Sequence, residues 1–91
     1  MGLHPALAHD LAPDGITVNA VLPGPIMTSR QLSTSREQFG DDVTAGLAER
    51  AKAIPAGRFG EPGEVASMIA YLTSEGASFT TGQAIAVSGG W

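Results

Sequence analysis

The spacing of apolar residues near the start of the chain predicts a short helix followed by a strand. Leu3, Leu7 and Leu11 fall four residues apart and therefore share one helix face. The Pro-Asp-Gly turn at 13–15 ends this helix, because the residue before a proline avoids the helical conformation and glycine readily turns left-handed. The run from Ile16 to Leu22 is apolar or β-branched almost throughout. Such a run is typical of a strand buried on both faces of a parallel sheet.

A second apolar repeat predicts a long helix in the middle of the chain. The residues that repeat every four positions are Phe39, Val43, Leu47 and Ala51. Ser35 followed by Gln38 resembles a capping box, so the helix is expected to run from about Ser35 to about Ala53. Gly40 and Gly46 each weaken it by about 0.5–1 kcal/mol relative to alanine.

The last third of the chain predicts one further helix and one short strand. An apolar stripe follows Pro62, which is tolerated as a first helical residue, and the helix is expected to end near Thr73. A strand is expected from Ala84 to Val87. The order helix, strand, helix, helix, strand is typical of an α/β fold, as one part of a doubly wound parallel sheet with a right-handed crossover. Two strands form a sheet too small to stand alone, and the first would expose an unpaired edge.

Composition places the chain among single globular domains and excludes several kinds of partner. The 91 residues are 43% hydrophobic and 15% charged, and the net charge of −4 disfavours nucleic acid and anionic membranes. Cysteine is absent, so there is neither a disulfide framework nor a thiolate zinc site. His4 and His9 do not share a helix face, so no metal site is expected. The first residues do not resemble a signal peptide and no apolar stretch approaches about 20 residues, so a cytoplasmic location is expected.

The best local candidate for a binding site is the tripeptide Pro23-Gly24-Pro25, which ends the first predicted strand. Ligands of open α/β sheets bind at the carboxyl ends of strands. Gly24 permits close approach to the backbone, while Ile26 and Thr28 offer an amide and a hydroxyl. Without further information, such a tripeptide is more often a plain turn.

Two segments resemble the carboxy-terminal part of the short-chain dehydrogenase/reductase family. The segment LAPDGITVNAVLPGPIMT, residues 11–28, is similar to the sixth strand of that family, and residues 57–90 are similar to its last helix and last strand. The resemblance implies that residues 1–91 form a partial NAD(P)-binding domain of the Rossmann type. It also implies that Pro23 and Gly24 line the nicotinamide site, that the Ile26 backbone binds the carboxamide, and that Thr28 contacts the cofactor. NAD and NADP remain equal alternatives, because the family's deciding residues have no counterpart here.

The departures from the family pattern remove its catalytic residues. No G-x-G-x-x-G motif occurs, and neither the family's catalytic Ser nor its Tyr-x-x-x-Lys pair has a counterpart. Tyr71 has Glu75 four residues later, and the lone lysine is Lys52. The catalytic motif is expected to fall just before Met1. The isolated chain is therefore expected to be inactive and to bind cofactor weakly, because proton transfer requires a phenol beside a cation.

Three functional hypotheses follow from this resemblance. In the first, the chain is the carboxy-terminal part of an NAD(P)-dependent oxidoreductase acting on an alcohol/carbonyl pair, with a small-molecule substrate in the full-length context. Ser29 to Phe39 then occupies the place of the family's variable substrate-covering loop, or is a flexible connection. Alternatively, the chain is a non-catalytic assembly module that self-associates through its last helix and strand, Glu64 to Leu72 and Ala84 to Val87. A truncated reading frame or a separately cut fragment is the third hypothesis.

Overall fold

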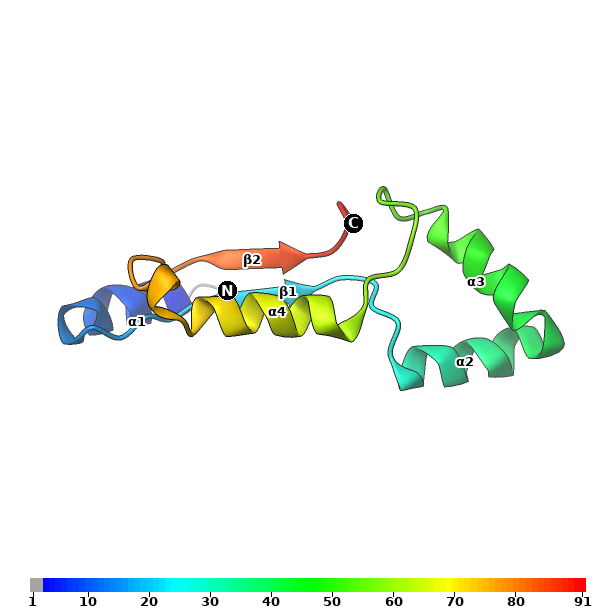
Figure 1. Cartoon of the computed structure of the whole chain (residues 1–91), viewed down its shortest axis with the longest axis horizontal. Helices are drawn as coiled ribbons and strands as arrows, with labels where there is room; N and C mark the ends of the chain where they lie inside the picture. Colours follow the sequence, from blue (N-terminus) through cyan, green and yellow to red (C-terminus); the bar gives the residue numbers. More distant parts are fainter. Residues whose placement is uncertain (1–2) are drawn as a thin grey trace. The chain divides into compact units, whose positions relative to one another are not determined.

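A computed structural model describes residues 3–91 and divides the chain into two compact units (Figure 1). The first unit comprises the residues up to Leu22 together with Gly63–Val87, and the second comprises Pro23–Pro62 together with Ser88–Trp91. The elements run as α1 Leu3–Leu11, β1 Ala20–Pro23, α2 Ser29–Phe39, α3 Val43–Ala51, α4 Pro62–Leu72 and β2 Ala84–Val87. Helices α1 and α4 and strands β1 and β2 belong to the first unit, except for the terminal residues Pro62 and Pro23, and helices α2 and α3 belong to the second. Short 3-10 turns lie at Ala12–Asp14, Gly40–Asp42 and Glu75–Ala77.

The first unit contains a two-stranded parallel sheet of β1 and β2, which confirms the α/β class (Figure 1). The regular strand β1 begins at Ala20, four residues later than predicted. Asn19 explains the difference, because its side chain occupies positions that a backbone ladder would otherwise fill. Its amide nitrogen donates to the Thr80 carbonyl at 3.1 Å, and its amide oxygen accepts from the Gln83 N–H at 3.1 Å. The polar residue inside the apolar run therefore joins the segments that precede the two strands.

Burial within the first unit is sparse. Ala8 and Ala77 are its buried apolar residues among those described, and Leu22 at the end of β1 is 41% exposed. The prediction of a strand buried on both faces is therefore wrong for this chain. Helix α4 contributes no fully buried residue to the unit. The physical reason is that two strands and two short helices offer too few covering side chains for both faces of a sheet.

The second unit corrects the prediction of one long helix from about Ser35 to Ala53. Thr28 caps α2, with its hydroxyl oxygen accepting from the Gln31 N–H at 3.1 Å, so the helix begins at Ser29. Gly40, with a φ of +61°, ends α2, and the 3-10 turn that it begins leads into α3, which contacts α2. The structure therefore has three helices between its strands rather than two. Ser35, predicted as a cap, lies inside α2 and is buried.

Candidate functional site

The loop after β1 is held by a single backbone bridge to Gly60. The Gly60 N–H donates to the Pro25 carbonyl, and the Met27 N–H donates to the Gly60 carbonyl, both at 2.9 Å. These two hydrogen bonds place Ile26 opposite Gly60 in a parallel bridge. The predicted site residues therefore occupy a loop of defined conformation rather than a free connection.

Gly24 is required by the packing of this loop. A Cβ atom at Gly24 would lie 2.7 Å from the Ser88 Cβ and 2.8 Å from the Ser88 Cα. Because one of these atoms is backbone, no side-chain rotation could relieve the contact. The glycine thus allows close approach of the Ser88 backbone, whereas its predicted contact with a ligand stays a prediction, as does that of Pro23 at the end of β1.

Ile26 and Thr28 present two hydrogen-bond donors. The Ile26 carbonyl accepts from the Thr28 N–H at 3.0 Å, whereas the Ile26 N–H donates to no group of the described part of the chain. The Thr28 hydroxyl oxygen accepts a bond as the cap of α2, which leaves its proton available to a further acceptor. The loop therefore brings the two predicted donors together on two nearby residues.

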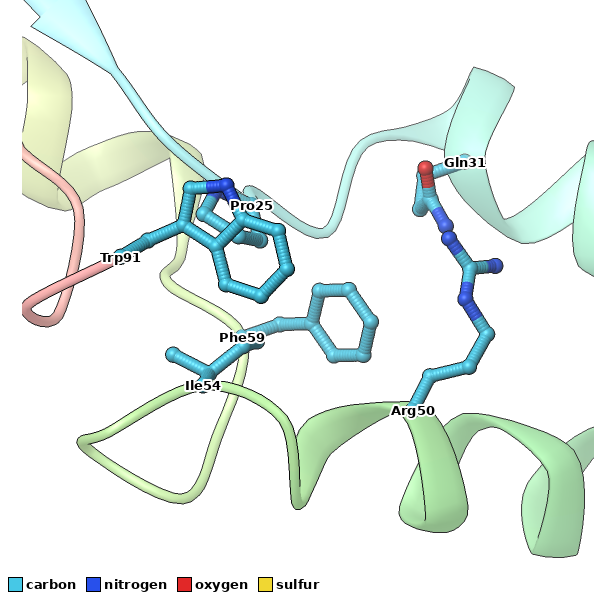
Figure 2. A pocket seen from close by; sticks show the side chains of 6 residues that line it. All are labelled: Pro25, Gln31, Arg50, Ile54, Phe59 and Trp91. Atoms are coloured by element: carbon cyan, nitrogen blue, oxygen red, sulfur yellow. The ribbon is translucent and has the colours of Figure 1, made fainter.

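A pocket of about 280 Å³ lies in the second unit, beside this loop (Figure 2). Its lining consists of Pro25, Gln31, Arg50, Ile54, Phe59 and Trp91. The Arg50 guanidinium lies 5.8 Å from the centre of the Phe59 ring, within the range of a cation–π contact. The only charged side chain of this lining is therefore held beside an aromatic wall.

Two polar groups of α2 orient Arg50. Its Nη1 donates to the Ser35 hydroxyl at 3.1 Å, and Ser35 is fully buried. The Gln31 amide oxygen accepts from Nη1 at 2.7 Å and from Nη2 at 2.8 Å. This orientation exchanges the amide oxygen and nitrogen relative to Figure 2, because only oxygen can accept from a guanidinium.

The cluster of Gln31, Ser35 and Arg50 was not predicted from the sequence. Gln31 and Ser35 lie four residues apart on α2 and so share a helix face, while Arg50 lies in the last turn of α3. That spacing is the signal in the sequence, but it is recognisable only once the two helices are known to be separate. Because Ser35 was predicted to cap a helix, its position on the same helix face as Gln31 was not recognised.

Tyr71 and Lys52, the lone tyrosine and lysine of the sequence, each bind another residue and not each other. The Tyr71 hydroxyl donates to the Gly76 carbonyl at 3.2 Å, which fixes the turn after α4. The exposed Lys52 pairs with Glu49 at 2.9 Å. Within residues 3–91, no group of three or more His, Asp or Glu side chains is placed to hold a metal ion. No helix of that part of the chain is both long and apolar enough to cross a membrane.

Comparison with known proteins yields one family and many relatives. The family profile described as enoyl-(acyl carrier protein) reductase matches residues 1–91. The 2-keto-3-deoxy-L-fuconate dehydrogenase of Xanthomonas campestris is 38% identical over 100% of this chain and 30% of its own length. The 3-oxoacyl-(acyl-carrier-protein) reductase of Aquifex aeolicus is 43% identical over 99% of this chain and 33% of its own length.

Solved structures agree with these sequence relatives. The L-sorbose reductase of Gluconobacter frateurii, solved with NADPH and L-sorbose, matches with a TM-score of 0.88 and 34% identity. The match covers 96% of this chain and 35% of that protein. The chain thus spans about a third of the length of the relatives that it matches.

Proposed function

The chain belongs to the short-chain dehydrogenase/reductase family, and we propose that it supplies the nicotinamide-side loop and the substrate-side helices of an NAD(P)-dependent oxidoreductase acting on an alcohol/carbonyl pair. The loop at Ile26 and Thr28 binds the nicotinamide end of the cofactor. Helices α2 and α3 cover the substrate. The observation that carries this proposal is the Ile26 N–H, which has no partner among the described groups although the loop around it is held by hydrogen bonds on both sides.

The donors of this loop fit a nicotinamide. A carboxamide carries a carbonyl oxygen that accepts hydrogen bonds, and a fixed N–H donor meets it without losing conformational freedom on binding. The Thr28 hydroxyl adds a second donor close by, on the residue that caps α2. The bound nicotinamide would supply the hydride. Ile26 and Thr28 orient its ring, and the bridge to Gly60 keeps them in place.

The sequence contains no tyrosine with a lysine four residues later, the pair that would activate a phenol as the proton donor for carbonyl reduction. The proton donor expected in such enzymes is a phenol activated by a neighbouring cation. Tyr71, the lone tyrosine, is followed by Glu75 at the position where a lysine would be needed, and its hydroxyl is bonded to the Gly76 carbonyl. We therefore propose that the isolated chain binds the nicotinamide end weakly and does not turn over.

A binding experiment tests whether the loop binds the nicotinamide end of the cofactor without the rest of the molecule. Nicotinamide mononucleotide, titrated into the 91-residue chain and followed by amide NMR, is expected to shift the Ile26 and Thr28 cross-peaks. Calorimetry with NADH or NADPH is expected to show no binding tighter than about millimolar, because the phosphate-binding glycine motif is absent from the sequence.

Adenosine monophosphate is the matched control, because it carries the same ribose phosphate without the nicotinamide. It is expected to leave both cross-peaks in place. Equal shifts with the two mononucleotides would contradict the assignment of the loop. Tight saturable binding of NADH, or turnover by the pure chain, would contradict the proposed weak and inactive state.

Self-association is a second candidate function, favoured by the exposure of α4. This helix has no buried residue in the chain, and its Ile69 and Tyr71 are 49% and 52% exposed. Half-exposed apolar side chains on one helix favour contact with a further surface. We propose that α4 and β2 pack against a second copy of the chain.

Sedimentation at several concentrations tests this second candidate. The wild-type chain is expected to show a concentration-dependent dimer, and Ile69→Glu is expected to shift it to monomer, because a buried unpaired charge is costly. Ile16→Glu is the control, since Ile16 is similarly exposed but lies outside α4 and β2. A wild-type chain that remains monomeric throughout would refute self-association.

A further inference from the structure

We propose that the pocket lined by Arg50 binds a small organic carboxylate whose apolar part packs against Phe59 and Trp91. The site lies wholly within the second unit. It requires no nicotinamide and no hydride chemistry, so the inference goes beyond the proposed oxidoreductase role and holds independently of it.

The hydrogen bonds of Arg50 leave one edge of its guanidinium available. A guanidinium carries five N–H donors in a fixed plane. Ser35 takes one on Nη1, and the Gln31 oxygen takes one on each of Nη1 and Nη2. The two remaining N–H groups, one on Nε and one on Nη2, are parallel and form the side edge of the guanidinium. This edge matches the two oxygens of a carboxylate in a bidentate pair.

The charge of the pocket favours an anion. Arg50 is the charged member of the lining, and no carboxylate side chain is among the lining residues. The groups that orient it, a serine hydroxyl, a glutamine amide and an aromatic ring, are all neutral. They hold the guanidinium in position but do not neutralise it. An incoming carboxylate would therefore gain both hydrogen bonds and a compensating charge.

The remaining wall of the pocket favours an organic anion over an inorganic one. Ile54 is buried, whereas Trp91 is 67% exposed and presents its indole at the pocket. Figure 2 shows the Phe59 ring between the Trp91 indole and the Arg50 side chain. A ligand with a flat apolar body would cover these side chains and remove their surface from water. A volume of about 280 Å³ limits it to a small molecule.

Preorganisation explains why this arginine, and not another, forms the site. Ser35 is fully buried inside α2, so the hydroxyl that positions the guanidinium has little freedom to move. Folding has thus already fixed the arginine side chain, so that ligand binding does not further reduce its conformational entropy. Arg36 lies on α2, as Ser35 does, but outside the pocket lining, so it is the natural comparison for Arg50.

Benzoate is a suitable probe, with benzamide as its neutral counterpart and inorganic phosphate as an anion without an apolar body. Trp91 is the lone tryptophan of the sequence, so its single indole N–H cross-peak reports this pocket. Titration of the full chain is expected to give saturable shifts with benzoate, at a Kd of about a millimolar. Benzamide and phosphate are each expected to bind about tenfold more weakly or not at all.

Three variants assign the effect to the guanidinium. Arg50→Gln is expected to weaken benzoate binding about tenfold or more, and Arg50→Lys, which keeps the charge but loses the planar fork, by about threefold or more. Arg36→Gln removes the same charge outside the pocket and is expected to change the Kd less than twofold. Far-UV circular dichroism verifies folding, and if Arg50→Gln is unfolded, the comparison of Arg50→Lys with Arg36→Gln decides.

Several results would overturn the proposal. Equal affinities for benzoate and benzamide would show that the apolar wall, not the arginine, binds the ligand. Equal losses in Arg50→Gln and Arg36→Gln would show a general charge effect. No movement of the Trp91 indole cross-peak at high benzoate would show that the pocket binds no carboxylate. None of these outcomes depends on whether nicotinamide mononucleotide shifts the Ile26 cross-peak, so the two proposals can fail separately.

Discussion

Replacing Ile54 by alanine is expected to unfold most of the second unit. Ile54 is 3% exposed and is the one large apolar side chain fully buried there among the described residues. Its methyl groups face the C-terminal segment, since a Cβ at Gly89 would lie 3.3 Å from the Ile54 Cγ2. Removing them leaves a cavity that neighbouring side chains cannot fill, at a cost of about 2–5 kcal/mol. In a chain this short that is a large share of the free energy of unfolding.

Urea unfolding followed by Trp91 fluorescence measures this loss, because Trp91 lines the same pocket as Ile54. Ile16→Ala deletes the same atoms from a side chain that is 47% exposed, and it is expected to change stability by less than about 1 kcal/mol. Similar urea midpoints for the two variants would mean that Ile54 is not a core residue.

Replacing Gly24 by alanine is expected to destabilise the second unit by about 1–3 kcal/mol. The added Cβ would lie 2.8 Å from the Ser88 Cα, so the backbone at Ser88 or at Gly24 must move. Such a movement also displaces the loop that carries Ile26. The weak nicotinamide mononucleotide shifts should therefore decrease in parallel with the urea midpoint.

Gly63→Ala serves as the comparison for this substitution. Gly63 lies near the start of α4, and a Cβ there would meet no atom within 4 Å. Alanine is the better helix former, so this change is expected to be neutral or to stabilise the chain by up to about 1 kcal/mol. If Gly24→Ala were equally harmless, Ser88 would not be in contact with the loop.

The sequence predicted best the elements whose boundaries are set by local chemistry. The last helix was expected from Pro62 to about Thr73 and runs from Pro62 to Leu72, because proline fits a first helical residue and an apolar stripe follows it. The last strand has the bounds predicted for it, Ala84–Val87. In both cases the deciding signals lie within a few residues of the boundary.

Predictions failed where a distant partner decides the structure. Thr28 was considered as a ligand contact, yet it also caps α2, and this moves the start of the helix away from the Ser35 box. Asn19 is the polar residue inside the predicted strand, and its side chain bonds to residues near position 80, which no local pattern indicates. The loop residues of the candidate site were predicted from their place at the end of a strand, and the resemblance added their roles. The bridge from Ile26 to Gly60 has no local signature, because its two residues lie far apart in sequence.

That bridge makes the segment 28–59 an exchangeable cassette. The chain leaves the strand-end loop after Met27 and returns to it at Gly60, where one pair of hydrogen bonds brings the two ends of the segment together. Within the segment, the Ala56 N–H also donates to the Gly89 carbonyl. A replacement of different length would alter the entropy of loop closure by only about 0.6 kcal/mol for each doubling. Recombination could therefore exchange α2 and α3, the helices that we propose cover the substrate, while the bridged loop keeps its register, so that a new specificity need not be accompanied by a new fold.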